Sequence, residues 1–331
     1  MIPGRRTALP CLMLAAACAS AAAASLDTIV KENWYASDAA KALLLQERKD
    51  LARLLPLLDP YGLVIPPERA RRGLGGVEFA LGRQRLVYPL PGGGLEQAGV
   101  EQPFFLLNPD AARSDSKVVT VEGRWPDSSE SWTRQVRVEP ITAPDMILDA
   151  GQRTLTLFRI DARSTRAVIN RLSARLADGF TLDLRYCQGG DLYETIDILS
   201  DWLPEDNKVA ELIAANGEEY EYFTQKTGNR LPAPGVILQS ELTASACEVL
   251  AGALTAYLEV PVAGAPSYGK CWSQQEFMLD DGNRLHLTTH YYSYAPDFEC
   301  RGAGIPVNKI IPASQRFLPA AALKELPQRE D

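Results

Sequence analysis

The chain is short of histidine and of paired metal ligands. Its 331 residues include two histidines, His286 and His290, and six cysteines, none of them in a C-x-x-C pair. Zinc sites are built from clusters of cysteine and histidine at characteristic short spacings. We therefore expect no metal site.

Positive charge and long apolar runs are also scarce. The chain has 34 lysines and arginines against 42 aspartates and glutamates, a net charge of −8, and its basic residues form no cluster. An acidic chain without a basic patch argues against a nucleic-acid partner. No apolar run reaches the roughly 20 residues needed to span a bilayer, so we expect no membrane span.

The first 24 residues have the pattern of a secretory signal. Arg5 and Arg6 are followed by an apolar run over 8–17 and by small residues ending at Ala24. This order predicts export to the periplasm or the extracellular space, with cleavage before Ser25. Lipidation of Cys18 is a less favoured alternative, because the leucine of the expected motif, Leu14, lies one position too early.

From residue 154 onward the pattern alternates between strands and helices. Strands are predicted at 155–160, 180–184, 236–239 and 260–263, and helices at 164–176, 192–203 and 246–257. Such alternation indicates helices packed on a sheet. Two further strands, 274–279 and 284–291, flank the hairpin turn Asp280–Asn283. The fold class is therefore α+β.

The segment Thr243-Ala244-Ser245-Ala246-Cys247-Glu248 places a serine after a predicted strand and at the first turn of a predicted helix. Lys270 follows 25 positions later. Backbone amides at a helix N-terminus can hold the oxyanion of an acyl-transfer intermediate, and a lysine can serve as base. By itself the pair is weak, since a helix cap and a solvated lysine explain it equally.

Four ordered blocks between residues 150 and 312 strengthen this interpretation. The Ser245 block and Gly269-Lys270 with Gln274 resemble the S-A-S-A-S-E and G-K-G-x-x-Q motifs of the C-terminal processing, or tail-specific, serine peptidases. The segment 182–190, L-D-L-R-Y-C-Q-G-G, resembles that family's L-D-L-R-x-N-x-G-G loop, and 287–292 with 304–306 resemble its later strand and G-I-x-P turn.

The resemblance implies a crotonase/ClpP-like β-α core over 145–331, with a preceding or inserted PDZ-like domain and an N-terminal helical segment. It assigns Ser245 as nucleophile, Lys270 as base and Gln274 as the residue that orients the lysine. The implied oxyanion donors are the amides of Ala246 and Gly189, with Gly190 close by. The sequence departs from the family at Cys187-Gln188 in place of Asn-Pro, at Cys247 and Cys271, and at Ala256 in place of an aspartate.

Residues 25–70 are predicted to form an N-terminal helical segment. Apolar positions keep helical spacing over 25–58, and the Asp-Pro-Tyr segment that breaks this pattern, Asp59–Tyr61, resembles the family's D-P-Y. Residues 72–140 resemble a PDZ module whose carboxylate-binding loop would be Gly73, Leu74, Gly75 and Gly76. PDZ domains bind a peptide as an added edge strand. A module that keeps the fold without binding a ligand is the alternative.

The implied protein is an exported serine endopeptidase that cuts unfolded or C-terminal polypeptide segments without a cofactor. Its partners would be polypeptide substrates, with a homo-oligomer or an adaptor protein left open. Two alternatives remain. One is a triad of Ser245 with His286 or His290, and the other is a non-catalytic exported protein that binds peptides.

Four cysteines lie beyond the signal, namely Cys187, Cys247, Cys271 and Cys300. Four cysteines permit three full pairings, and the sequence does not choose among them. The predicted hairpin sets Leu279 opposite Arg284 and hence Cys271 opposite Tyr292. A turn over 295–298 would then return Cys300 to the same place. We therefore expect a Cys271–Cys300 disulfide, with Cys187–Cys271 as its competitor.

Overall fold

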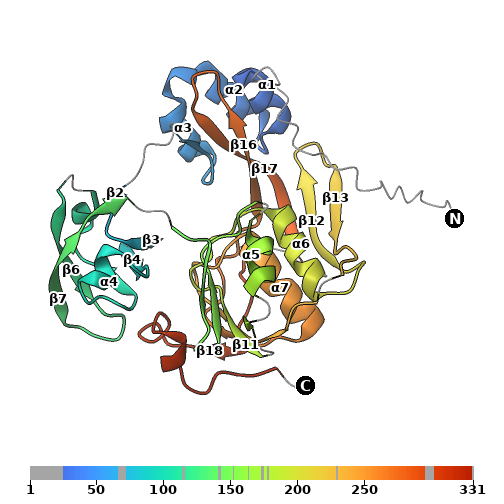
Figure 1. The fold of residues 1–331 in the computed structure, drawn as a ribbon. Coiled ribbons are helices and arrows are strands. Elements are labelled where there is room, and N and C mark those ends of the chain that lie inside the picture. The colour runs from blue at the N-terminus through green and yellow to red at the C-terminus, as the bar shows by residue number, and fades with distance from the viewer. Residues whose placement is uncertain are drawn as a thin grey trace. The chain divides into compact units, whose positions relative to one another are not determined.

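The protein is described here by a computed structural model that places residues 25–65, 72–113, 116–140, 143–151, 153–162, 164–172, 175–176, 179–228, 230–294 and 302–329. The chain divides into two compact units (Figure 1). Unit 1 comprises residues 1–67 and 274–288. Unit 2 comprises residues 68–273 and 289–331.

Unit 1 combines the N-terminal helices with the tip of a later hairpin. Helices α1 (Leu26–Asn33) and α2 (Asp38–Gln46) each begin after a serine whose side chain accepts a backbone N–H in the first turn, and α3 (Leu51–Leu58) leads into β1 (Leu63–Ile65). Strand β1 pairs with the first part of β17 (Arg284–Tyr294). The core contains Trp34, Leu44, Leu55 and Leu285. Apolar burial thus joins segments more than 200 residues apart in the sequence.

The first part of unit 2 is a module of antiparallel strands. Strands β3 (Gly76–Leu81), β4 (Gln84–Pro89), β5 (Phe104–Leu106), β6 (Val118–Arg124) and β7 (Ser131–Arg137) pair in chain order, and β2 (Arg72–Gly73) pairs with β8 (Glu139–Pro140). The short helix α4 (Gly94–Gln97) and the 3-10 helix η2 (Pro109–Arg113) complete it. Leu95, Phe104 and Val121 lie in its core.

The rest of unit 2 is built on a six-stranded sheet of order β18-β15-β14-β11-β10-β9. The strands are β9 (Met146–Asp149), β10 (Thr154–Leu157), β11 (Phe180–Asp183), β14 (Pro234–Gln239), β15 (Val262–Gly264) and β18 (Lys309–Ile310). All neighbours are parallel except β9 and β10. The apolar residues of β11 and β14 fit a strand buried on both faces.

Helices α5 (Thr165–Leu172), α6 (Leu192–Trp202) and α7 (Ala246–Leu258) follow strands of this sheet, as crossover connections between parallel strands require. Helix α6 packs against both others, and α7 also contacts β12 (Lys208–Ala214). Strand β12 pairs with β13 (Glu219–Phe223) and with the last part of β17. A large apolar core includes Leu182, Ile198, Leu250 and Tyr292.

The predicted α+β class and the predicted strands and helices of the β-α region are confirmed, with ends that differ by up to four residues. The predicted hairpin is also confirmed. Strand β16 (Trp272–Met278) pairs with β17, the amide of Leu279 donates to the carbonyl of Asn283, and the amide of Tyr292 donates to the carbonyl of Cys271. The β12–β13 hairpin was not predicted.

Candidate active site

Ser245 lies at the sharp turn between β14 and α7, immediately before the first residue of the helix. Its backbone has φ 59° and ψ −129°, a conformation that is strained for a residue with a side chain. The turn is built locally. The Ser240 amide donates to the Thr243 hydroxyl, and the Thr243 hydroxyl donates to the carbonyl of Leu184 at the end of β11. These bonds fix the exit of the strand and hold Ser245 at the start of α7.

Glu248, three residues after Ser245, joins this turn to the segment that carries Lys270. Its Oε2 accepts the backbone amides of Ser245 at 2.8 Å and Lys270 at 3.0 Å. Its Oε1 accepts the Ser267 hydroxyl at 2.6 Å and the Gly269 amide at 2.7 Å. Since one oxygen binds both amides, the backbone nitrogens of Ser245 and Lys270 lie within about 6 Å of each other.

The Glu248 side chain is fully buried. Burial raises the pKa of its carboxyl, and the four donated hydrogen bonds oppose that shift. No role was predicted for Glu248, although its place three residues after a helix N-cap is the glutamate position of a capping box. Its contacts with 267–270 depend on the tertiary fold.

The segment that carries Lys270 is docked on the serine turn by its backbone. The amide of Tyr268 donates to the carbonyl of Thr243 at 2.8 Å. Gly269 has φ +76°, and a Cβ added there would come within 2.8 Å of the backbone of Gly302. A glycine is therefore needed immediately before the lysine. Lys270 itself is partly buried.

The predicted oxyanion loop follows β11 and lies against the serine. Gly189 has φ +117°, and a Cβ added there would be 2.7 Å from the Cβ of Ser245 and 3.2 Å from its Oγ. The loop is held from the other side, because the Ile160 amide donates to the carbonyl of Gly189 and the Asp191 amide donates to the carbonyl of Ile160. Gly190 takes part in this bridge to Ile160.

Three amides at this place have no protein acceptor. Within the described parts of the chain, the N–H groups of Gly189, Gly190 and Ala246 donate no hydrogen bond. Gly189 and Ala246 are buried, whereas Gly190 is exposed. Because buried backbone donors are normally paired, the open amides of Gly189 and Ala246 beside a strained serine are suited to bind a ligand oxygen. The structure thus brings Ser245, Ala246 and Gly189 together, as expected from the sequence.

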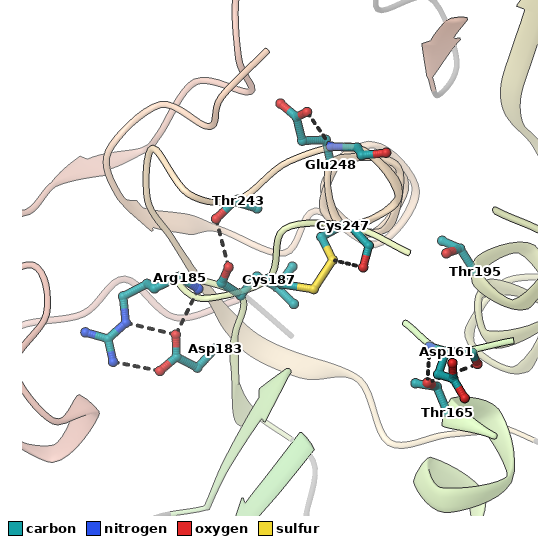
Figure 2. Close-up of a disulfide and its surroundings, with 12 residues drawn as sticks. Asp161, Thr165, Asp183, Arg185, Cys187, Thr195, Thr243, Cys247 and Glu248 are labelled. Atoms are coloured by element: carbon teal, nitrogen blue, oxygen red, sulfur yellow. Dashed lines mark hydrogen bonds and ion pairs between the residues drawn. A yellow bond between two sulfur atoms is a disulfide. The ribbon is translucent and has the colours of Figure 1, made fainter. Parts of the chain in front are cut away.

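A buried ion pair between Asp183 and Arg185 stabilises the start of the loop that follows β11. Arg185 donates from Nε to Asp183 Oδ1 at 2.8 Å and from Nη2 to Asp183 Oδ2 at 2.7 Å (Figure 2). The same guanidinium donates to the carbonyls of Arg316 and Leu318. Because both side chains are buried and every charge is hydrogen-bonded, this pair fixes the exit of β11 rather than exposing charge to the site.

Cys187 and Cys247 form a disulfide, with their Cα atoms 6.1 Å apart (Figure 2). This bond shows that the competing Cys187–Cys271 pairing is wrong, because Cys187 is already bonded. Cys271 is disulfide-bonded as well. Cys300, its predicted partner, lies outside the described residues, so that pairing stays a prediction.

Gln274 lies on β16 and belongs to unit 1, whereas Ser245 and Lys270 belong to unit 2. Its side-chain amide donates to the Thr288 hydroxyl at 3.3 Å. The Thr288 hydroxyl donates to the buried carboxylate of Asp59, which also accepts the indole N–H of Trp34. Its predicted role beside the lysine stays a prediction, and its place in a hydrogen-bonded network with the N-terminal segment was not foreseen.

The two histidines have other partners. The Nε2 of His286 lies 2.7 Å from Glu276. The Nδ1 of His290 lies 2.8 Å from the Thr289 hydroxyl, and its ring contacts Tyr220. Burial lowers the pKa of His290. The described hydrogen bonds of both histidines do not include Ser245, so a histidine triad has no support here.

In the part of the chain that the structure places, no three cysteine, histidine or acidic side chains are grouped to hold a metal ion. No helix there has the length and apolarity to cross a membrane.

In the predicted carboxylate-binding loop, two backbone carbonyls accept hydrogen bonds from within the module. The carbonyl of Leu74 accepts the Leu95 amide, and the carbonyl of Gly75 accepts the Leu90 amide. The loop therefore packs on the entry of α4, and Gly73 and Gly76 lie in the flanking strands.

Comparisons with known proteins find similarity over the region that carries these features. Residues 150–307 match the model of peptidase family S41. The carboxyl-terminal-processing protease of Synechocystis sp. is 33% identical over 162 residues, which span 49% of this chain and 38% of that protein. That of Picosynechococcus sp. is 27% identical over 302 residues, 79% of this chain and 72% of that protein.

Among solved structures, a photosystem II D1 C-terminal processing protease superimposes with a TM-score of 0.58 and 19% identity. The superposition covers 86% of this chain and 90% of that one. At this identity the likeness shows the fold.

Proposed function

Because this chain belongs to peptidase family S41 through residues 150–307, we propose that it is an exported serine endopeptidase acting on unfolded or C-terminal polypeptide segments. Ser245 is the nucleophile and Lys270 is the general base. The amides of Ala246 and Gly189 form the oxyanion hole, with Gly190 beside them. Gln274 orients the lysine.

The observation that carries this proposal is the Glu248 carboxylate, which binds the backbone amides of the proposed nucleophile and the proposed base with one oxygen. A serine hydroxyl needs a nearby base to accept its proton during attack on a peptide carbonyl. A neutral Lys270 amine takes that proton. The negative charge that develops on the carbonyl oxygen is then met by the open amides beside Ser245.

The reaction proceeds through an acyl-enzyme. The protonated lysine returns its proton to the leaving amine, which leaves the acyl group on Ser245. Water then enters, loses a proton to the lysine and attacks the ester, again with the oxyanion held by the two amides. The bond between the acyl carbon and Ser245 Oγ breaks, the lysine returns the proton to Ser245, and the carboxylic acid product leaves. The family's aspartate is absent at Ala256, so the position of the base depends on Glu248 and Gln274.

Export is supported by the Cys187–Cys247 disulfide, since disulfides persist chiefly in oxidising compartments. The predicted signal, residues 1–24, lies outside the described residues. N-terminal sequencing of the protein recovered from the periplasmic or culture fraction tests the proposal. We expect the mature chain to begin at Ser25, and recovery of the uncleaved chain from the cytosol alone would contradict export.

The module of residues 72–140 is proposed to be PDZ-like and to meet the polypeptide substrate. Its support is the position of β3 at one edge of the antiparallel sheet, where an extended peptide can pair. Its test is binding of a labelled peptide with a free C-terminus, compared with the same peptide amidated at its C-terminus.

A homo-oligomer or an adaptor protein as a further partner is tested by size-exclusion chromatography with light scattering.

Catalysis is tested with a denatured protein as substrate. Ser245→Ala and Lys270→Ala should each abolish cleavage while the fold is kept, whereas Lys226→Ala, at an exposed lysine, should leave the rate unchanged. A fluorophosphonate probe should label Ser245. Full activity of either site variant would refute the pair, and binding of unfolded polypeptide without labelling would favour the non-catalytic alternative.

The base is tested by the pH dependence of the rate. Because the lysine acts only when it is neutral, the rate should rise with pH and stay high on the alkaline side. A rate that falls steadily between about pH 6 and pH 9 in a stable enzyme would exclude a lysine base.

A further inference from the structure

We propose that the Cys187–Cys247 disulfide positions the oxyanion hole, so that catalysis in this protein requires the oxidised bond. The inference rests on the proposed function of Ser245. The two cysteines are 60 positions apart in the sequence and fully buried. Cys187 lies two residues before Gly189, and Cys247 directly follows Ala246. Each proposed oxyanion donor is thus within two residues of a bonded cysteine.

The disulfide ties the loop to the first turn of α7, beyond the hydrogen bonds that join Ser240 and Thr243 to the carbonyls of Arg185 and Leu184. Beyond Gln188 the loop is held by Ile160, through the carbonyl of Gly189 and the bridge at Gly190. On the side of the serine, the carbonyl of Cys187 accepts the Ala244 amide at 3.0 Å. Figure 2 shows the disulfide reaching from the loop to the first turn of α7. The hydrogen bonds described between the two segments join residues 184, 185 and 187 to the turn before Ser245, whereas the disulfide reaches Cys247 on the helix itself.

An oxyanion hole is sensitive to that separation. Both amides must lie about 2.7 to 3.1 Å from one oxygen atom, and loss of one donor lowers the rate by about 100- to 1000-fold. The related peptidases have Asn-Pro where this chain has Cys187-Gln188, and proline restricts the backbone through its fixed φ. Here Gln188 gives no such restriction. The disulfide supplies a constraint in its place.

The first experiment compares the wild type with Cys187→Ala/Cys247→Ala. We expect kcat to fall by about 10- to 100-fold and KM to stay within about threefold, because the constraint acts on the oxyanion and not on the bound peptide. Affinity for a peptide aldehyde, which forms an oxyanion on Ser245, should fall by the same factor as kcat. Affinity for the matching peptide alcohol should not change.

Val249→Ala is the matched control, since it removes apolar atoms from a buried residue near the start of α7 and leaves both cysteines in place. It should lower thermal stability and leave kcat near that of the wild type. An equal loss of kcat in this control would show that destabilisation alone explains the effect and would overturn the proposal. A wild-type kcat in the double cysteine variant would overturn it as well.

A second measurement needs no substitution and covers the case of a variant that does not fold. The wild type is treated with a trialkylphosphine in water. The phosphine gives two electrons to the disulfide and takes the oxygen of a water molecule to become the phosphine oxide, and the two protons of that water complete the two thiols. Alkylation and peptide mapping then give the fractions of free Cys187, Cys247 and Cys271, and circular dichroism monitors the fold. Activity should fall in proportion to the fraction of free Cys187 and Cys247 in samples whose Cys271 is still disulfide-bonded.

Unchanged activity with both thiols free would refute the positioning role. The proposed function is tested separately in the untreated wild type by fluorophosphonate labelling of Ser245. If Ser245 is not labelled there, the proposed function fails and this inference fails with it. If Ser245 is labelled but the rate ignores the disulfide, only this inference fails.

Discussion

Replacing Glu248 by glutamine is the sharpest perturbation of the proposed site, because the two side chains have nearly the same shape. Each carboxylate oxygen accepts two donors: Oε1 those of Ser267 and Gly269, and Oε2 those of Ser245 and Lys270. A glutamine keeps one acceptor oxygen. Its NH2 group must then face either the amides of Ser245 and Lys270 or, with the amide turned, the amide of Gly269 beside the Ser267 hydroxyl, which can also accept.

The magnitude follows from the donors that lose their acceptor. At least one buried backbone donor then loses its acceptor, and each such donor costs about 1 to 3 kcal/mol. We therefore expect a loss of about 1 to 6 kcal/mol in the free energy of unfolding, a large share of the roughly 5 to 15 kcal/mol typical of a folded protein. The repulsion also separates the serine turn from the lysine segment, and a shift of about 1 Å can lower kcat by about 100-fold.

The assay combines urea denaturation followed by tryptophan fluorescence with the rate of fluorophosphonate labelling of Ser245. Glu259→Gln serves as control, because Glu259 is an exposed residue at the other end of α7. The control should match the wild type in both measurements. A Glu248→Gln variant that unfolds within about 0.5 kcal/mol of the wild type, or that is labelled at the wild-type rate, would refute the role assigned to this carboxylate.

Three further predictions concern other parts of the molecule. Gly189→Ala should lower kcat by about 100-fold or more, since its Cβ would collide with Ser245 at a φ of +117°. The control is Gly217→Ala, which also has a positive φ but has open space around it, and it should stay active in the same peptidase assay. Asp59→Asn should destabilise unit 1 by about 1 to 3 kcal/mol, seen as a lower unfolding midpoint reported by Trp34 fluorescence, because the new NH2 faces donors that the carboxylate accepted; an unchanged midpoint would contradict it. Burial lowers the pKa of His290, so as the pH falls the imidazole is protonated in the unfolded chain before it is protonated in the folded one, and stability should fall as the pH drops below about 6.5. In His290→Asn, the part of the decline in urea midpoint that comes from this histidine should disappear. An identical decline in the variant would exclude His290 as its source.

Local patterns in the sequence determined much of the β-α region. Apolar runs and turn residues predicted its strands and helices, because short-range periodicity and turn chemistry act within a few residues. The hairpin turn at 280–283 also fixed a register, and the expected pairing of Cys271 with Tyr292 is present. The order of the motif blocks was enough to indicate the peptidase family, since it needs no knowledge of spatial contacts.

The tertiary structure decided what depends on segments far apart in the chain. Four cysteines left three pairings open, and the choice of Cys247 for Cys187 follows from the docking of the β11 loop on α7. Glu248 could be recognised locally as a capping residue, but two of its four donors come from Gly269 and Lys270, more than 20 positions away. The β12–β13 hairpin and the packing of Leu285 with the N-terminal helices were likewise not predicted from the local sequence pattern. In each case the arrangement is stabilised by contacts between segments far apart in the sequence, and these segments meet in a defined register only once the chain has folded.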